Sequence, residues 1–168
     1  MMQPLITRND IARYRQISKT PNDAKLNEMI LDAQLLDLQP LLGENLFNKI
    51  LASPEDYTEL LDGCVYDKDG ISYTSYGVKM VLAYYTYARY MMFGSVTDTP
   101  YSVVEKLNSE SRPAEASSKK SIYQNNRDAA NKLWQSVHNW LLRTNNEDYK
   151  KSCNAPAAQG SMRFTKIS

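Results

Sequence analysis

78-VKMVLAYYTYARYMMFG-94 holds four tyrosines and three methionines beside only two charged residues, and it predicts a central helix. At about 100° per residue, one apolar stripe consists of Val78, Val81, Leu82, Tyr85 and Met92. A second stripe, on nearly the opposite side, consists of Met80, Tyr84, Tyr87 and Met91. A helix that is apolar this far around is typically buried, and in a short chain a neighbouring subunit can cover part of its surface.

This helix should begin with Thr74 or Ser75 as N-cap and end at Gly94. Arg89 lies in the first stripe, and its side chain either extends past the apolar surface to solvent or forms an ion pair across a subunit contact. Tyrosine combines a large ring with a hydroxyl group, which suits surfaces that become buried on assembly. The candidates for a subunit interface are therefore Met80, Tyr84, Tyr87, Met91 and Arg89.

Short helices are predicted before this segment. In an N-terminal arm, residues 1–20, Thr7 and Asp10 have the spacing of a capping box. Thr20 followed by Pro21 predicts the start of the next helix, and Pro40 should end it.

Two further helices and a hairpin follow. Residues 42–52 have helical periodicity, and 53-SPED-56 has the pattern of a capping box for a helix that stops at Gly63. The alternation in 64-CVYDKDGISYT-74 predicts a β-hairpin with Gly70 at a positive φ. A calcium-loop interpretation fails, because Ser72 stands where the glycine is needed and Val78 where the glutamate is needed.

The C-terminal half is predicted to contain one long helix, residues 121–143. Residues 94–120 read as a long connection in which 100-PYSVVEKL-107 forms a strand or a short helical turn. Residues 145–168 are too polar and too rich in proline and glycine to pack alone, and we expect a tail. The predicted fold is mainly α: a small helical bundle, residues 21–144, with one β-hairpin, an extended N-terminal arm and a C-terminal tail.

Composition excludes several classes of function. The chain of 168 residues has a net charge of +1, so no overall field attracts nucleic acid. Lys79 and Arg89 interrupt the most apolar segment, which argues against a membrane span, and the N-terminus lacks the pattern of a signal peptide. Cys64 and Cys153 belong to no metal-binding motif and read as free thiols of a protein made in the cytoplasm, with a disulfide as the alternative.

Catalytic patterns are weak. His138 is the single histidine and lies beside an apolar helix face, where a packed side chain is the common interpretation. Asp32, Asp37 and Glu44 are expected on solvated helix faces. Lys119, Lys120 and Arg127 form a modest basic patch that reads as solvated charge. We expect a protein that is not an enzyme, with no catalytic residues, no metal and no cofactor.

The order of several segments resembles head–tail connector (adaptor) proteins of tailed bacteriophages, and more narrowly the portal-proximal ring protein of crAss-like phages. The segments are 5-LITRNDI-11, 23-DAKLNEMILDAQLLDLQPLLG-43, 60-LLDG-63, 84-YYTYARY-90 and 99-TPYSVVEKL-107.

The resemblance implies a structural virion protein at the head–tail junction. Such subunits form a homo-oligomeric ring, commonly of twelve copies, beneath the portal protein, and the ring extends the DNA channel toward neck and tail proteins. The tail would contact the portal, and its candidate residues are Lys150, Lys151, Met162, Arg163, Phe164 and Lys166. The alternatives are a helical scaffolding or regulatory interaction module, and a DNA-binding protein.

Overall fold

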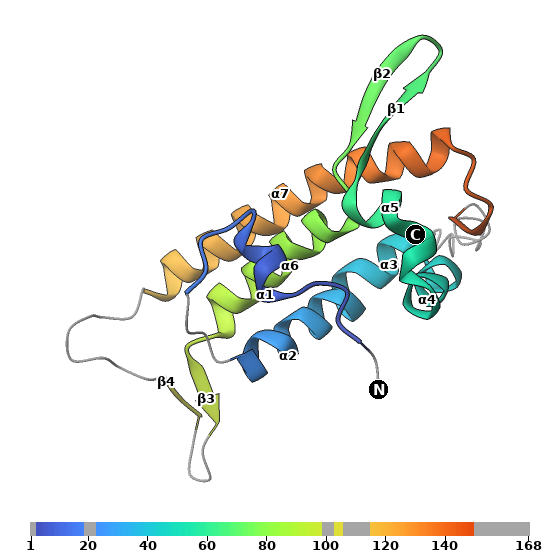
Figure 1. Cartoon of the computed structure of the whole chain (residues 1–168). Helices are drawn as coiled ribbons and strands as arrows, with labels where there is room; N and C mark the ends of the chain where they lie inside the picture. Colours follow the sequence, from blue (N-terminus) through green and yellow to red (C-terminus); the bar gives the residue numbers. More distant parts are fainter. Residues whose placement is uncertain (1–2, 19–22, 99–102, 106–114, 150–168) are drawn as a thin grey trace, which may run out of the picture.

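The structure, a computed structural model, describes residues 3–18, 23–98, 103–105 and 115–149 (Figure 1). It is mainly helical, as the sequence predicts. The elements are α1(Arg8–Ala12), α2(Asp23–Ala33), the π-helix η1(Gln34–Leu38), α3(Gln39–Leu42), α4(Glu44–Ala52), the 3₁₀-helix η2(Pro54–Tyr57), α5(Thr58–Asp62), β1(Cys64–Lys68), β2(Ile71–Ser75), α6(Val78–Phe93), β3(Val96–Asp98), β4(Val103–Glu105) and α7(Ala116–Arg143).

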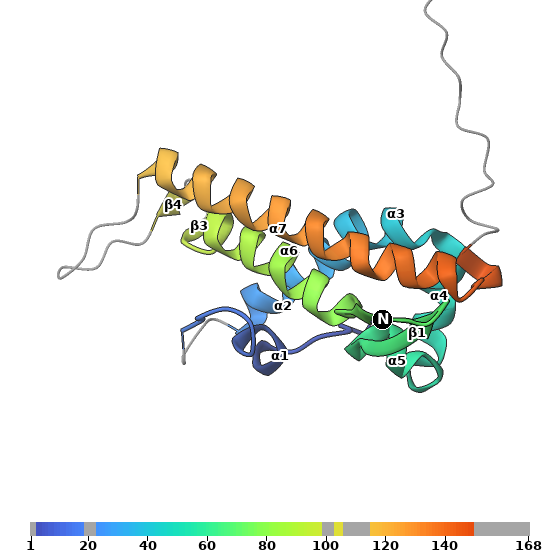
Figure 2. The ribbon, with the colours of Figure 1, turned by 90° about the horizontal axis from the view of Figure 1, so that it is seen from above.

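Helix α6 is the centre of the fold. Helix α7 packs along it, while α1, α2 and α5 contact other parts of its surface (Figures 1 and 2). The first predicted stripe faces this core, where Val78, Val81 and Leu82 are completely buried. Ala83, Thr86 and Ala88 are buried as well, so the helix is covered around most of its circumference. The prediction of a central helix is confirmed.

Two predicted helix boundaries are wrong, namely the end of the first long helix and the start of α5. Pro40 does not end the first long helix, because α2 continues through the π-helix η1 into α3 and stops at Gly43. The missing N–H of Pro40 falls where the hydrogen-bond spacing changes from the π to the α pattern, so little is lost there. Ser53 makes no side-chain capping bond, since residues 54–57 first form a 3₁₀ turn.

The hairpin forms as predicted and extends one residue further. Cys64 pairs with Ser75 and Lys68 pairs with Ile71, and the turn between them has φ of 54° at Asp69 and 78° at Gly70. Because Ser75 belongs to the strand, neither it nor Thr74 caps α6, and Gly77 takes that position. Helix α6 ends at Phe93, before Gly94, as expected.

The predicted long connection contains more regular structure than expected. β3 and β4 form a second antiparallel pair, and β4 confirms a strand within residues 100–107. Helix α7 begins at Ala116, five residues before its predicted start at Ser121. Among the described helices, none combines the length and the apolar character needed to cross a bilayer.

Candidate functional site

The second stripe of α6 lies beneath the N-terminal arm. Helix α1 packs against α6, and Met80, Tyr84, Tyr87 and Met91 are each half-buried. The Arg15 guanidinium stacks on this stripe, with Cζ 4.1 Å from the ring centroid of Tyr84 and 5.8 Å from that of Tyr87. The chain's own arm therefore covers part of the predicted subunit interface, and the rest of each side chain remains open.

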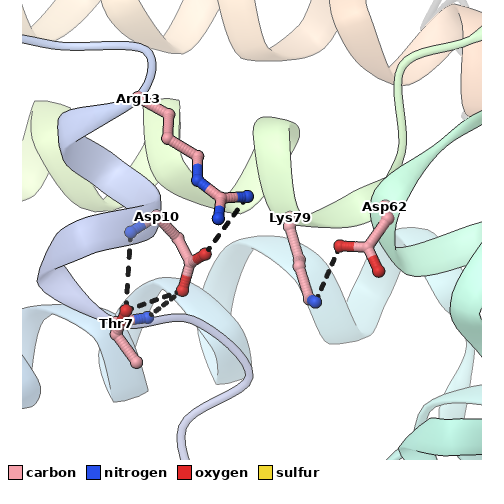
Figure 3. Close-up of polar contacts among 5 residues, drawn as sticks. All are labelled: Thr7, Asp10, Arg13, Asp62 and Lys79. Atoms are coloured by element: carbon pink, nitrogen blue, oxygen red, sulfur yellow. Dashed lines mark hydrogen bonds and ion pairs between the residues drawn. The ribbon is translucent and has the colours of Figure 1, made fainter.

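Polar side chains fix the path of this arm. Thr7 and Asp10 form the predicted capping box: the Asp10 carboxylate accepts from the Thr7 backbone N at 2.8 Å, and the Thr7 hydroxyl accepts from the Asp10 backbone N at 3.4 Å (Figure 3). Burial raises the pKa of Asp10, but the hydrogen bonds from Thr7 and the charge of Arg13 outweigh it, so the net pKa is lowered. In the same view, Lys79 at the start of α6 pairs with Asp62 of α5 at 2.7 Å (Figure 3).

The π-helix η1 holds the arm through the side chain of Gln34. Gln34 is completely buried, accepts from the Leu5 backbone N at 2.9 Å and donates to the Gln3 carbonyl at 3.1 Å. Ile6 and Ile11, on the arm itself, are buried in the core. One amide side chain thus satisfies two backbone groups of the arm, which orients the two isoleucines into the core.

Asp37, on the same π-helix, is the centre of a buried ionic cluster. Its side chain is 3% exposed and accepts from Arg89 Nε at 2.7 Å and from Arg127 Nη1 at 2.6 Å. The interpretation that Arg89 extends to solvent is therefore wrong, and its Nε forms an ion pair within the chain. Asp37 was expected on a solvated face, and this is wrong, because it follows Ile30 and Ala33 at helical spacing and so lies on the stripe that α2 buries.

Aromatic and amide side chains surround this cluster. The Tyr85 hydroxyl donates to Asn131 Oδ1 at 2.5 Å, and Arg127 Cζ lies 5.4 Å from the ring centroids of both Tyr85 and Tyr123. Burial, with a smaller contribution from the Asp37 charge, raises the pKa of Tyr85. Burial lowers the pKa of Arg127, but pairing with Asp37 outweighs it and leaves the pKa raised. The cluster connects η1, α6 and α7 through charge as well as packing.

Two glycines cross at the base of the β1–β2 hairpin. Gly63 has φ of 88° and Gly77 has φ of 80°. A Cβ on Gly63 would lie 2.5 Å from the Ser75 carbonyl oxygen, and one on Gly77 would lie 2.5 Å from the Gly63 nitrogen. Both contacts are with backbone atoms, which cannot move aside as a flexible side chain can. The chain therefore enters and leaves the hairpin through a crossing that only glycine fits.

Arg143, at the end of α7, holds the hairpin from one side. Its Nη1 donates to the Tyr66 hydroxyl at 2.9 Å, and its Cζ lies 3.8 Å above the ring of Tyr73. Beyond this contact the hairpin projects from the helices (Figure 1), and Val65 and Ile71 are 70% and 55% exposed. Cys64, at its base, is a free thiol whose pKa is raised by burial.

A depression of about 530 Å³ lies between α3 and α7. Trp134, His138 and Tyr149 line one side of it, and His138 Nδ1 is 2.5 Å from the Tyr149 hydroxyl. Tyr149 is 4% exposed, and Asp148 pairs with Lys49 at 2.8 Å. Residues 148–149, which the sequence assigned to the tail, therefore pack on the body.

The remaining predicted residues are distributed differently from expectation. Lys119 donates to Ser95 at 3.0 Å and Arg127 belongs to the Asp37 cluster, so the predicted basic patch is not a single solvated surface. The candidate portal-contacting residues, Lys150, Lys151, Met162, Arg163, Phe164 and Lys166, lie outside the described residues, as does Cys153.

Sequence reasoning missed the residues that organise this region: Arg15, Gln34, Asp37, Gly63, Gly77 and Arg143. The two glycines had a usable signal, because Gly63 directly precedes β1 and Gly77 follows β2 after one intervening residue. Asp37 also had a signal, since it continues the helical spacing of the buried Ile30 and Ala33. Arg15, Gln34 and Arg143 had none, because their partners are far away in the sequence, as with Tyr66, 77 positions before Arg143.

Comparison with known proteins identifies a family, but the function of that family is unknown. The chain belongs to a family of unknown function, DUF6712, whose model matches residues 38–159. The matched range includes the hairpin, α6 and α7, and begins after the arm and Asp37. No curated protein and no solved structure matches the chain.

Proposed function

We propose that this chain is a structural virion protein that joins a phage head to its tail. It forms a ring beneath the portal, extends the DNA channel and offers a docking surface to neck or tail proteins. The observation that carries the proposal is the β1–β2 hairpin, which projects from the helices on a fixed base and exposes apolar side chains.

A projecting hairpin of this kind must be stabilised by contacts with the rest of the chain. Two-stranded hairpins are marginally stable in water when they stand alone. Here the glycine crossing and Arg143 fix the base, while Val65 next to that base and Ile71 beside the turn are left to solvent. Both strands are edge strands, whose open backbone groups favour pairing or packing with another chain. These features favour a contact element.

The positions of the two β pairs fit a ring. The β1–β2 hairpin leads directly into α6, and β3 follows its other end. The 16 residues of α6 separate the two pairs by about 24 Å. Different surfaces at the two ends of one subunit suit head-to-tail contacts, which close into a ring when the rotation between copies allows it. The resemblance in segment order supplies the phage context and the expected twelve copies.

The experiment is light scattering after size exclusion, with and without the portal protein of the same phage. The full-length chain should form a complex of many subunits when the portal is present. A shorter chain should end at Tyr149, because Asp148 and Tyr149 pack on the body. Loss of the complex in the shorter chain would assign portal binding to the tail, and assembly without the tail would remove that role while leaving the adaptor.

Two results would favour the alternatives. A full-length chain that ignores the portal and stays monomeric or dimeric supports a scaffolding or regulatory module. Retention of duplex DNA with a steep dependence on salt supports a DNA-binding protein.

A further inference from the structure

We infer that neighbouring copies of this chain meet through the tip of the hairpin and Arg15: Asp67 and Asp69 of one copy pair with the Arg15 guanidinium of the next. The inference rests on the proposed ring, for which it names the two surfaces in contact. It concerns only the contact between copies and requires no particular mode of portal binding.

Arg15 is the cationic partner in this contact, because none of the described residues accepts a hydrogen bond from its guanidinium. Its Nε is buried and has no hydrogen-bond partner, and no hydrogen bond or ion pair with the described residues reaches its other guanidinium nitrogens. The guanidinium plane is already oriented by stacking on Tyr84, with Cζ 4.1 Å from the ring centroid. Only Nε of this guanidinium is buried, so a carboxylate from a neighbouring copy would bind the two terminal nitrogens side by side, and arginine favours such bidentate pairing.

Asp67 and Asp69 are the accepting partners in this contact, because they are exposed acids on a projecting hairpin with a fixed base. No ion pair or hydrogen bond joins either carboxylate to the described part of the chain. Asp69 lies in the turn and Asp67 opposite Ser72, one residue before Lys68. Since the glycine crossing and Arg143 set the direction of the hairpin, the two acids are presented with little loss of freedom on binding.

The charges of the two surfaces are complementary. In the arm, residues 3–18, three arginines (Arg8, Arg13, Arg15) and one acid (Asp10) give a net charge of +2. In the hairpin, residues 64–75, Asp67 and Asp69 against Lys68 give −1. The hairpin rises away from the arm of its own copy (Figure 1), so the acids are placed to meet the arm of a neighbour. Two different complementary surfaces on one chain make a head-to-tail contact.

The test is a charge exchange in the full-length chain. Asp67→Lys with Asp69→Lys, and separately Arg15→Glu, should each weaken association between copies by about tenfold or more, measured by sedimentation and light scattering over a concentration series. The chain that combines all three substitutions should regain association, because lysines then face a glutamate. Arg13→Glu is the matched control on the same arm: its side chain is 70% exposed and it changes the net charge of the arm as much as Arg15→Glu does, so it should weaken association less than Arg15→Glu if Arg15 makes the specific contact.

The melting temperature of each variant shows whether it still folds. The Asp67→Lys, Asp69→Lys chain should melt at the same temperature as the unsubstituted chain, because both acids are exposed. The inference is overturned if the single-surface variants assemble like the unsubstituted chain, or if the combined variant stays as weak as its parents. A chain that never associates, alone or with portal, overturns it too. Association restored by charge exchange in a chain that ignores the portal would keep this contact and refute the adaptor function. If portal-dependent rings form equally well with all these substitutions, the adaptor function is kept and this contact between copies is refuted.

Discussion

Replacing Asp37 by asparagine should destabilise the fold more than any other single exchange of an acid for its amide. Asp37 accepts hydrogen bonds from Arg89 and Arg127, and its side chain is 3% exposed. An asparagine keeps the shape, but it removes the negative charge and turns a donor toward one of the two guanidinium groups.

The magnitude follows from the exposure of the two arginines. Breaking a buried ion pair by removing one partner costs about 3–5 kcal/mol. The Arg89 side chain is 13% exposed and should lose nearly the full pairing, whereas Arg127 is 29% exposed and regains some hydration. We therefore expect a loss of about 3 kcal/mol in the free energy of unfolding.

Urea unfolding followed by circular dichroism measures this loss. The matched control is Asp32→Asn, a half-buried acid five residues earlier in the same helical segment, for which we expect a change within about 0.5 kcal/mol. A double-mutant cycle with Arg89→Gln should show that the two losses are not additive. An Asp37→Asn chain as stable as its control would refute the central role given to this carboxylate.

Three further predictions concern the hairpin and the arm. Gly77→Ala should cost at least about 2 kcal/mol more than Gly70→Ala in urea unfolding, because both positions have positive φ but only Gly77 would bring a Cβ to 2.5 Å from backbone; equal losses would contradict the crossing. Arg143→Ala should speed amide exchange in the hairpin while leaving α6 protected, and unchanged hairpin exchange would show that Arg143 does not hold it. Asp10→Asn should cost about 1 kcal/mol at neutral pH. Because the folded-state pKa of Asp10 is lowered, that stabilisation is present above the unfolded pKa of about 4 and disappears as the pH falls through the folded value, so the two chains should converge in acid.

The sequence predicts those parts of the fold that depend on neighbours along the chain. Helix α6 is visible because its apolar residues recur over 16 positions and Gly94 follows its end. The capping box at Thr7 and the positive φ of Gly70 are visible for the same reason, since their partners lie within three residues. Local patterns of this kind need no knowledge of tertiary packing.

Features that depend on distant partners were not predictable. A fixed 100° per residue assumes a regular α-helix, so the π turn at 34–38 was invisible. Asp37 falls on the apolar stripe at that spacing, but its charge suggested a solvated face because the two arginines that pair with it lie far along the chain. Without Asp37 in place, Arg89 had no partner within the chain and was assigned to solvent or to another subunit. Arg15 reads as an ordinary surface charge until the stacking on Tyr84 and the partnerless Nε are known.

The π-helix also makes the chain sensitive to a kind of change that substitutions do not imitate. Removing a single residue from 34–38 would leave a regular helix, yet every side chain on one side of the deletion would turn by about 100° relative to the other. Gln34 could then no longer hold the arm while Asp37 holds Arg89 and Arg127. In an alignment of relatives, a gap in this segment would therefore mark chains that attach their N-termini differently.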